Sequence, residues 1–150
     1  MNTIFRPKNI FFQTLATVLL CLAMTSTAAE FGKLSINNPT IHFQADGLQI
    51  TAPNQSWSWH LAVTGYGYGP NIQSVSKAKL SITGNRTEYQ YGNVTEWYLN
   101  DTNGLEQGIT LQTPPQPRTT APLTVEMALT TNLLPVLTDN NQAIVFLNET

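Results

Sequence analysis

The sequence predicts an all-β protein: an antiparallel β-sandwich of about eight to ten short strands, preceded by an N-terminal signal peptide. Threonine, a β-branched residue that suits strands, is the most frequent residue, with 21 copies in 150 residues. Apolar and polar residues alternate in many short runs, and turn residues separate these runs at roughly ten-residue spacing. Beyond the N-terminal segment, no run of ten residues shows the apolar spacing of an amphipathic helix.

The first 29 residues have the three parts of a secretory signal peptide. Arg6 and Lys8 give a positive start, an apolar run follows, and small residues precede Glu30. The apolar run is about 15 residues long, whereas a membrane-spanning helix needs about 20. We therefore expect cleavage near Glu30 and a secreted, periplasmic or cell-surface location, with an uncleaved membrane anchor as the alternative.

Cleavage would leave residues 30–150 as one β-sandwich-like domain with five basic and nine acidic residues, a net charge of −4. This charge argues against a nucleic-acid partner, and we expect no membrane contact after cleavage. Cys21, the only cysteine, would leave with the signal peptide, so the mature chain would hold no disulfide and no cysteine-based site. The chain stops three residues after its last predicted strand, which suggests the N-terminal part of a longer protein.

The first predicted elements are two strands, 41–45 and 48–51, joined by an Asp46-Gly47 turn. Asp-Gly favours the type I′ turn because both central residues take positive φ. The expected cross-strand pairs are apolar on both sides: Ala45 with Leu48, Phe43 with Ile50, and Ile41 with Ala52. Agreement between turn chemistry and apolar register predicts a hairpin.

The next predicted strand covers residues 57–64 and has a heavy aromatic face that includes Trp57 and Trp59. The glycine-rich run from Gly65 to Pro70 is expected to end it as a loop. The remaining predicted strands cover residues 77–82, 87–91, 94–99, 105–112, 123–129 and 143–147. The turns expected between them include Gly84-Asn85, Gly92-Asn93, 101–104 and 139–141, and a proline-rich connector covers 113–118.

Strand 94–99 places Trp97 and Leu99 on one face together with Thr95. Turns fix both ends of this strand, so its apolar face should be firmly specified. We expect Trp97 in the core, packed on Leu99 and on an aromatic residue of a neighbouring strand.

The candidate metal ligands are few. His42 and His60 both lie on the less apolar face of a strand and could meet across neighbouring strands, but two histidines without a carboxylate at ligand spacing make a poor metal site. Residues 101–104 match only part of a calcium loop. Solvent-facing histidines and a plain turn are the favoured interpretations, and we expect no metal and no cofactor.

Glu88, Glu96 and Glu106 are the candidate catalytic residues, because a pair of carboxylates can hydrolyse glycosides. Glu88 and Glu96 could face each other across a hairpin. Surface carboxylates are the favoured interpretation, and we expect no enzymatic activity.

Four aromatic residues near the glycine-rich run are the candidate ligand-binding residues. Trp57, Trp59, Tyr66 and Tyr68 could stack on sugar rings or on a protein partner if they were displayed on the surface. Packing in the core or at a strand end is the favoured interpretation.

Residues 86–112 carry the runs VTEWY, GLEQG and TL, followed by two prolines. The characteristic positions are Glu88-Tyr89, Val94 to Tyr98, Asn100, Gly104 to Gly108, Thr110-Leu111 and Pro114-Pro115. This segment resembles one in the N-terminal region of large secreted bacterial proteins that carry FG-GAP (integrin-α-like) β-propeller repeats. The resemblance implies a β-rich module ahead of such repeats. The family's calcium-binding D-x-D-x-D-G repeats do not occur in this sequence, so no residue inherits adhesion or calcium binding.

The leading functional hypothesis is a non-catalytic structural or interaction module of a secreted or surface repeat protein. Its partner would be a protein or a glycan at the cell surface. A carbohydrate-binding module with an aromatic platform is the first alternative, and a glycan-active enzyme is the second.

Overall fold

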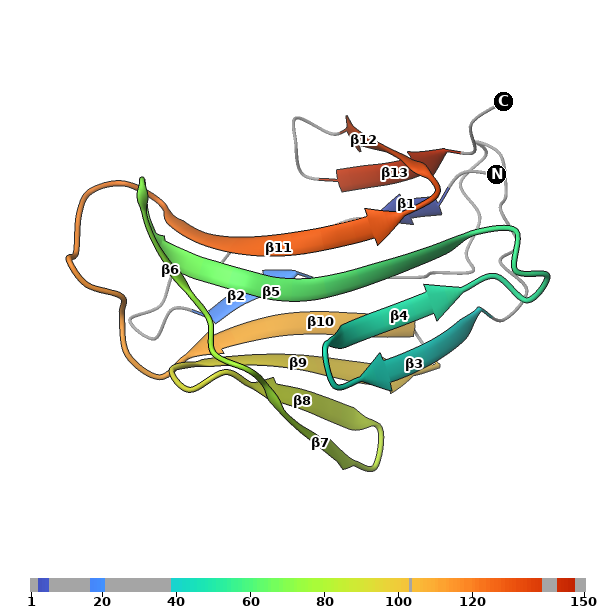
Figure 1. Ribbon diagram of the computed structural model, residues 1–150, viewed down its shortest axis with the longest axis horizontal. Helices are drawn as coiled ribbons and strands as arrows, with labels where there is room; N and C mark the ends of the chain where they lie inside the picture. The colour runs from blue at the N-terminus through green and yellow to red at the C-terminus, as the bar shows by residue number, and fades with distance from the viewer. Residues whose placement is uncertain (1–2, 6–16, 21–38, 103, 139–142, 148–150) are drawn as a thin grey trace.

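The computed structural model describes residues 3–5, 17–20, 39–102, 104–138 and 143–147. These residues form thirteen β-strands and no helix, which confirms the all-β prediction. The strands are arranged in three antiparallel sheets, which we call sheets I, II and III (Figure 1). Sheets I and II face each other as the two layers of a sandwich.

Sheet I has the strand order β11-β5-β4-β3, with β6 paired to β5. Its strands are β3 (Thr40–Gln44), β4 (Gly47–Thr51), β5 (Ser58–Tyr68), β6 (Asn71–Ser74) and β11 (Leu123–Thr131). The long strand β5 is the centre of the sheet, because β11 follows one of its edges while β4 and β6 share the other.

Sheet II has the strand order β2-β10-β9-β8-β7. Its strands are β2 (Thr17–Leu20), β7 (Lys79–Thr83), β8 (Arg86–Gln90), β9 (Val94–Asp101) and β10 (Gly104–Leu111). The four strands from β7 to β10 form a meander of successive hairpins, as the turn residues between them predict.

Sheet III is small, with the order β1-β13-β12. Its strands are β1 (Thr3–Phe5), β12 (Leu134–Thr138) and β13 (Ala143–Leu147). The sequence predicted β13 but not β12, which contains Pro135. Proline cannot donate to a strand ladder, and it is tolerated here because β12 lies at the edge of its sheet.

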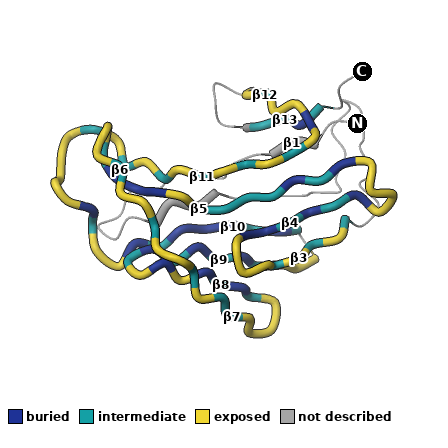
Figure 2. Tube along the Cα trace, viewed as in Figure 1, coloured by how far each residue is buried: buried dark blue, intermediate teal, exposed yellow. Residues whose placement is uncertain are grey.

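The core lies between sheets I and II, where Figure 2 shows buried residues along β4, β8, β9 and β10. The rings of Phe43 and Tyr98 meet across the sheets with centroids 5.4 Å apart. The Tyr89 hydroxyl donates to the Gly47 carbonyl oxygen at 2.8 Å, which ties the two layers together. The fully buried residues are mainly aromatic and aliphatic, including Trp57, Leu48, Ile50, Tyr89, Val94, Tyr98, Leu105 and Ile109. Sheet III joins the same core, because Phe146 stacks on Trp59 with centroids 6.1 Å apart.

The hairpin predicted near Asp46-Gly47 exists, but the predicted register is wrong: the observed strand pairing is shifted by two residues. Phe43 pairs with Leu48 and Ile41 pairs with Ile50, so Ala45 and Asp46 are the central turn residues. Only Gly47 takes a positive φ, 145°, and it does so just after the turn. A slip of two residues keeps every side chain on its expected face, which is why the apolar pattern alone could not detect it.

The prediction that residues 65–70 form a loop is also wrong, because β5 continues to Tyr68. The glycines permit a close approach of β6 instead. A Cβ atom on Gly67 would lie 1.9 Å from the carbonyl oxygen of Asn71, a distance that no side chain tolerates. Glycine here therefore serves strand pairing rather than turn formation.

Part of the N-terminal prediction lies outside the described residues: Arg6, Lys8, Cys21, the small residues from 25 to 29 and Glu30. The expected turn at 139–141 also lies outside them. Two short pieces of the predicted signal peptide are described, and both form strands, β1 on β13 and β2 on β10. The described part of the chain contains no helix long and apolar enough to cross a membrane.

Candidate functional site

Strand β9 carries polar chemistry on both of its faces, and Trp97 lies on the face away from the core. Val94 and Tyr98 point inward and are fully buried, whereas Trp97 is half-buried. The prediction of Trp97 as a core residue is therefore wrong. The pattern was misread because the buried face of this strand includes Glu96, a residue type that is almost never fully buried without a partner.

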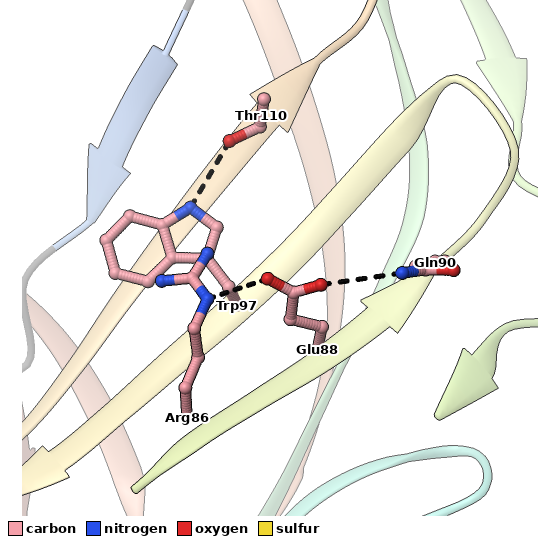
Figure 3. A network of polar contacts seen from close by, with 5 residues as sticks. All are labelled: Arg86, Glu88, Gln90, Trp97 and Thr110. Atoms are coloured by element: carbon pink, nitrogen blue, oxygen red, sulfur yellow. Dashed lines mark hydrogen bonds and ion pairs between the residues drawn. The ribbon is translucent and has the colours of Figure 1, made fainter. Parts of the chain in front are cut away.

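The outer face of sheet II carries a group of five residues that we call the outer-face cluster: Arg86, Glu88, Gln90, Trp97 and Thr110 (Figure 3). Antiparallel pairing brings them together, because Trp97 lies opposite Glu88 on β8 and opposite Gly108 on β10. Arg86 and Glu88 are two residues apart on one strand and so share a face.

The contacts in this cluster form a chain from β8 to β10. Arg86 donates from Nε to Glu88 Oε1 at 2.6 Å, and its guanidinium carbon lies 4.6 Å from the centre of the Trp97 ring. Gln90 Nε2 donates to Glu88 Oε2 at 3.4 Å. Trp97 Nε1 donates to Thr110 Oγ1 at 3.3 Å. The hydrogen bond from Arg86 lowers the pKa of Glu88 below its ordinary value, which favours the charged form of this carboxyl group.

Gly108 makes room for the Trp97 ring. A Cβ atom at this position would lie 2.1 Å from Cζ2 and 2.3 Å from Cε2 of the indole. The ring therefore lies against the β10 backbone and is held in one orientation between that backbone and Arg86.

The inner face of the same strand carries a second group, the buried carboxyl cluster: Tyr91, Glu96, Tyr98 and Gln107. Glu96 is 0% exposed, and three donors converge on its carboxyl group. Tyr98 Oη and Gln107 Nε2 each donate to Oε1 at 2.6 Å, and Tyr91 Oη donates to Oε2 at 3.0 Å. These donors give the buried carboxyl group hydrogen bonds in place of those that it loses with water on folding.

Burial dominates the electrostatics of this cluster. Loss of hydration raises the pKa of Glu96 above its ordinary value, and the three hydrogen bonds only partly oppose that rise. Burial likewise raises the pKa of the Tyr98 and Tyr91 hydroxyls, and the nearby Glu96 adds to the effect. The hydroxyls therefore stay protonated and remain donors.

Among the three carboxylates considered for catalysis, the expected facing pair of Glu88 and Glu96 does not form. Glu96 lies opposite Tyr89 on the core face, while Glu88 lies opposite Trp97 on the outer face, so the two cannot face each other. Glu106, on β10, lies opposite Leu99 of β9 and is on the same outer face as Glu88.

The aromatic residues proposed for ligand stacking are mostly internal. Trp57 is 2% exposed, Trp59 is 3% exposed and Tyr66 is 8% exposed. Tyr68 is partly exposed at the end of β5. Three of these four rings are therefore core residues, as the favoured interpretation of the sequence held, and they are not displayed as a platform.

The histidines are separated by a strand, since His42 lies opposite Gln49 of β4 and Gln49 lies opposite His60. His42 is exposed, and His60 Nε2 lies 3.7 Å from Asp46 Oδ1. Among the described residues there is no group of three or more His, Cys, Asp or Glu side chains that could hold a metal ion. Of the expected turn at 101–104, Asp101 pairs with Gly104 across a hairpin, and Asn103 lies outside the described residues.

Sequence reasoning missed both clusters as units. The outer-face cluster could have been found from the alternation Arg86, Glu88, Gln90 once Trp97 had been assigned to the outer face. Gln107, the main amide donor to Glu96, gives no signal in the sequence because its role depends on register. Comparison with models of known protein families, with curated proteins and with solved structures finds no match to this chain.

Proposed function

We propose that this chain is an exported, non-catalytic structural or interaction module, similar to the N-terminal β-rich region of secreted bacterial FG-GAP repeat proteins. Its interaction face is the outer-face cluster of sheet II. The observation that carries this proposal is the ordered arrangement of Trp97 between Gly108 and Arg86, with Glu88 holding the arginine.

Two physical arguments support an interaction role for this face. Tryptophan and arginine are the residue types that most often dominate binding energy at protein interfaces. Here both side chains are held before any partner arrives, so binding would cost little of the entropy that is normally lost when long side chains become ordered.

The positions of the acidic residues favour a non-catalytic role. Glu96 is fully enclosed and supplies acceptors to three core donors. Glu88 is engaged by Arg86 and Gln90. Both carboxyl groups thus have structural partners that account for their positions.

The binding test uses fluorescently labelled exported protein on cells from which its gene has been deleted. We expect Trp97→Ala and Arg86→Ala to reduce cell binding at least tenfold, because each removes a side chain of a preordered contact surface. Thr124→Ala, at an exposed position on β11, is the matched control and should bind like the original protein. Equal binding of all variants would show that the outer-face cluster is not the contact surface.

A carbohydrate-binding module is the second candidate, and Trp97 favours it, because a half-buried indole beside amide, hydroxyl and charged groups resembles a sugar-stacking site. Treating the cells before binding separates the two partners. Periodate, which oxidises glycans, would abolish binding to a sugar, whereas protease treatment would abolish binding to a protein.

Export and family context have their own tests. The N-terminus of exported protein should lie near Glu30, and an intact mass that retains residues 1–29 would support an anchor instead. Sequencing of the gene beyond the codon for Thr150 should find D-x-D-x-D-G repeats if the chain belongs to an FG-GAP protein.

A further inference from the structure

The two sheets that pack against the inner face of sheet I both end in a strand from the first twenty residues. The packing of sheet II against sheet I is seen in the contact between Gln107 Nε2 and Met127 Sδ of β11, which lie 3.8 Å apart. Sheet III packs against sheet I through the stacked rings of Phe146 and Trp59. One of the two end strands of sheet II is β2, and one of the two end strands of sheet III is β1. These strands come from the segment that we propose is removed during export.

The pairing of β10 with β2 is regular over four residues, from Gln107 opposite Leu20 to Thr110 opposite Thr17. The direction of the β10 amides follows from its other neighbour. Gln112 donates its backbone N–H to the Asn93 carbonyl at 2.9 Å, on the β9 side. Because amides alternate in direction along a strand, those of Gly108 and Thr110 also face β9, and those of Gln107 and Ile109 face β2.

The side chains of β10 define what an added strand must offer. Leu105, Ile109 and Leu111 point into the core and are 1–2% exposed. A strand beside them continues the same core face and therefore needs aliphatic residues there. The sequence of β2 is Thr-Val-Leu-Leu, which meets this requirement.

We propose that removal of residues 1–29 opens the edge of β10 as an acceptor for one extended, aliphatic strand of another polypeptide. The partner strand pairs antiparallel with residues 107–110 and takes the place of β2. This inference rests on the proposed export and cleavage. The partner would bind by adding a strand to the edge of the sheet. In this mode of recognition, backbone hydrogen bonds supply affinity and alternate side chains supply specificity.

A single strand fits this edge better than a second copy of the chain. Sheet III occupies the same side of sheet I as β10. A second copy would have to place a whole sheet on the face of sheet I against which sheet III already packs, whereas a partner strand needs only the width of β2.

The test compares amide hydrogen exchange in the full-length chain and in processed protein recovered after export, whose N-terminus is sequenced first. In the full-length chain, the amides of Gln107 and Ile109 should exchange as slowly as those of Gly108 and Thr110. In the processed protein, the first pair should exchange at least about tenfold faster, while the second pair stays protected by β9.

The probe for the partner strand is a lysine-flanked synthetic peptide of residues 16–21 with serine at the cysteine position. It should restore slow exchange at Gln107 and Ile109. The same peptide carrying Val18→Pro is the matched control and should not, because proline removes a backbone donor opposite Ile109.

Three results would overturn the proposal. Slow exchange of Gln107 and Ile109 in monomeric processed protein without peptide would show that the edge is covered by this chain itself. Protection that rises with protein concentration, together with a dimer by light scattering, would identify a second copy as the occupant. An N-terminus that retains residues 1–29 would overturn the proposed processing, and slow exchange in that protein would show β2 as a permanent strand.

Discussion

Glu88 and Glu96 lie on opposite faces of sheet II, and their pKa values shift in opposite directions. Glu88 lies on the outer face, where the hydrogen bond from Arg86 lowers its pKa. Glu96 lies on the inner face at the neighbouring strand, where burial raises its pKa although three donors surround it. The three hydrogen bonds to Glu96 do not make up for the hydration that its carboxylate loses on burial. At the half-exposed site of Glu88, the hydrogen bond from Arg86 outweighs the opposing effect of desolvation and lowers the pKa.

The comparison also separates two structural roles. The inner cluster is a polar network enclosed by core side chains, so its members depend on one another for satisfied hydrogen bonds. The outer cluster is open to solvent on one side, so each of its members can find water when its partner is removed. Substitutions on the inner face should therefore have larger effects on stability than matched substitutions on the outer face.

The largest effect is expected from Glu96→Ala. This change leaves Tyr91, Tyr98 and Gln107 without their shared acceptor, and each buried donor without a partner costs about 1–3 kcal/mol. We expect the free energy of unfolding to fall by about 3 kcal/mol or more, measured by urea denaturation. A loss below about 1 kcal/mol, the range of surface pairs, would contradict the distinction between the two faces.

Gly108→Ala should have the next largest effect. The added methyl group collides with the Trp97 ring, so the indole must leave its position or the strands must separate, at a cost of about 1–3 kcal/mol. Combining Gly108→Ala with Trp97→Ala removes the collision, so the double variant should be more stable than the sum of the two single changes predicts. Strict additivity in urea melts would show that the ring does not lie against Gly108.

The dependence of stability on pH should distinguish the two carboxyl groups. The folded protein holds the Glu96 proton more tightly than the unfolded chain, so its stability falls as pH rises from 4.5 through the raised pKa. The loss amounts to about 1.4 kcal/mol for each unit by which folding raises the pKa, and Glu96→Gln should abolish it. Urea melts at a series of pH values measure the difference between the two proteins. A constant difference across this window would contradict the raised pKa.

The smallest effect is expected from Glu88→Gln. The lowered pKa of Glu88 contributes stability above 4.5 that is lost as pH falls, but a half-exposed pair with Arg86 is worth only about 0.2–1 kcal/mol. The effect should disappear near 1 M salt, where screening acts within about 3 Å. Glu126→Gln, at an exposed position on β11, is the control and should change neither stability nor its dependence on salt.

Much of the fold could be predicted because strand alternation and turn residues are local signals. The meander from β7 to β10 follows directly from runs that end at glycine and asparagine. The register of the first hairpin could not be predicted, because a slip of two residues preserves the apolar face and only the φ angles of Ala45, Asp46 and Gly47 distinguish the alternatives.

The candidate sites were harder to predict because burial depends on which face of a strand meets the other sheet. In β9 the larger apolar residues, Trp97 and Leu99, pointed to the wrong face. Tyr98 and Val94 fill the core instead, and Glu96 is accepted there only because Gln107 and two tyrosines, none of them next to it in the sequence, supply donors. Likewise, the alternation of Gly65 and Gly67 indicates a loop until β6 is known to lie against them.

The contact between Trp59 and Phe146 has a consequence for how the chain folds. It joins residues that are far apart in the sequence, one near the start of β5 and the other in the last described strand. Long loops must close before such contacts can stabilise the folded chain. All-β proteins dominated by contacts between distant residues therefore fold in about milliseconds to seconds. Strand β5 therefore cannot complete its packing until the final hairpin has been synthesised, and the chain stays open for strand exchange and aggregation throughout that interval.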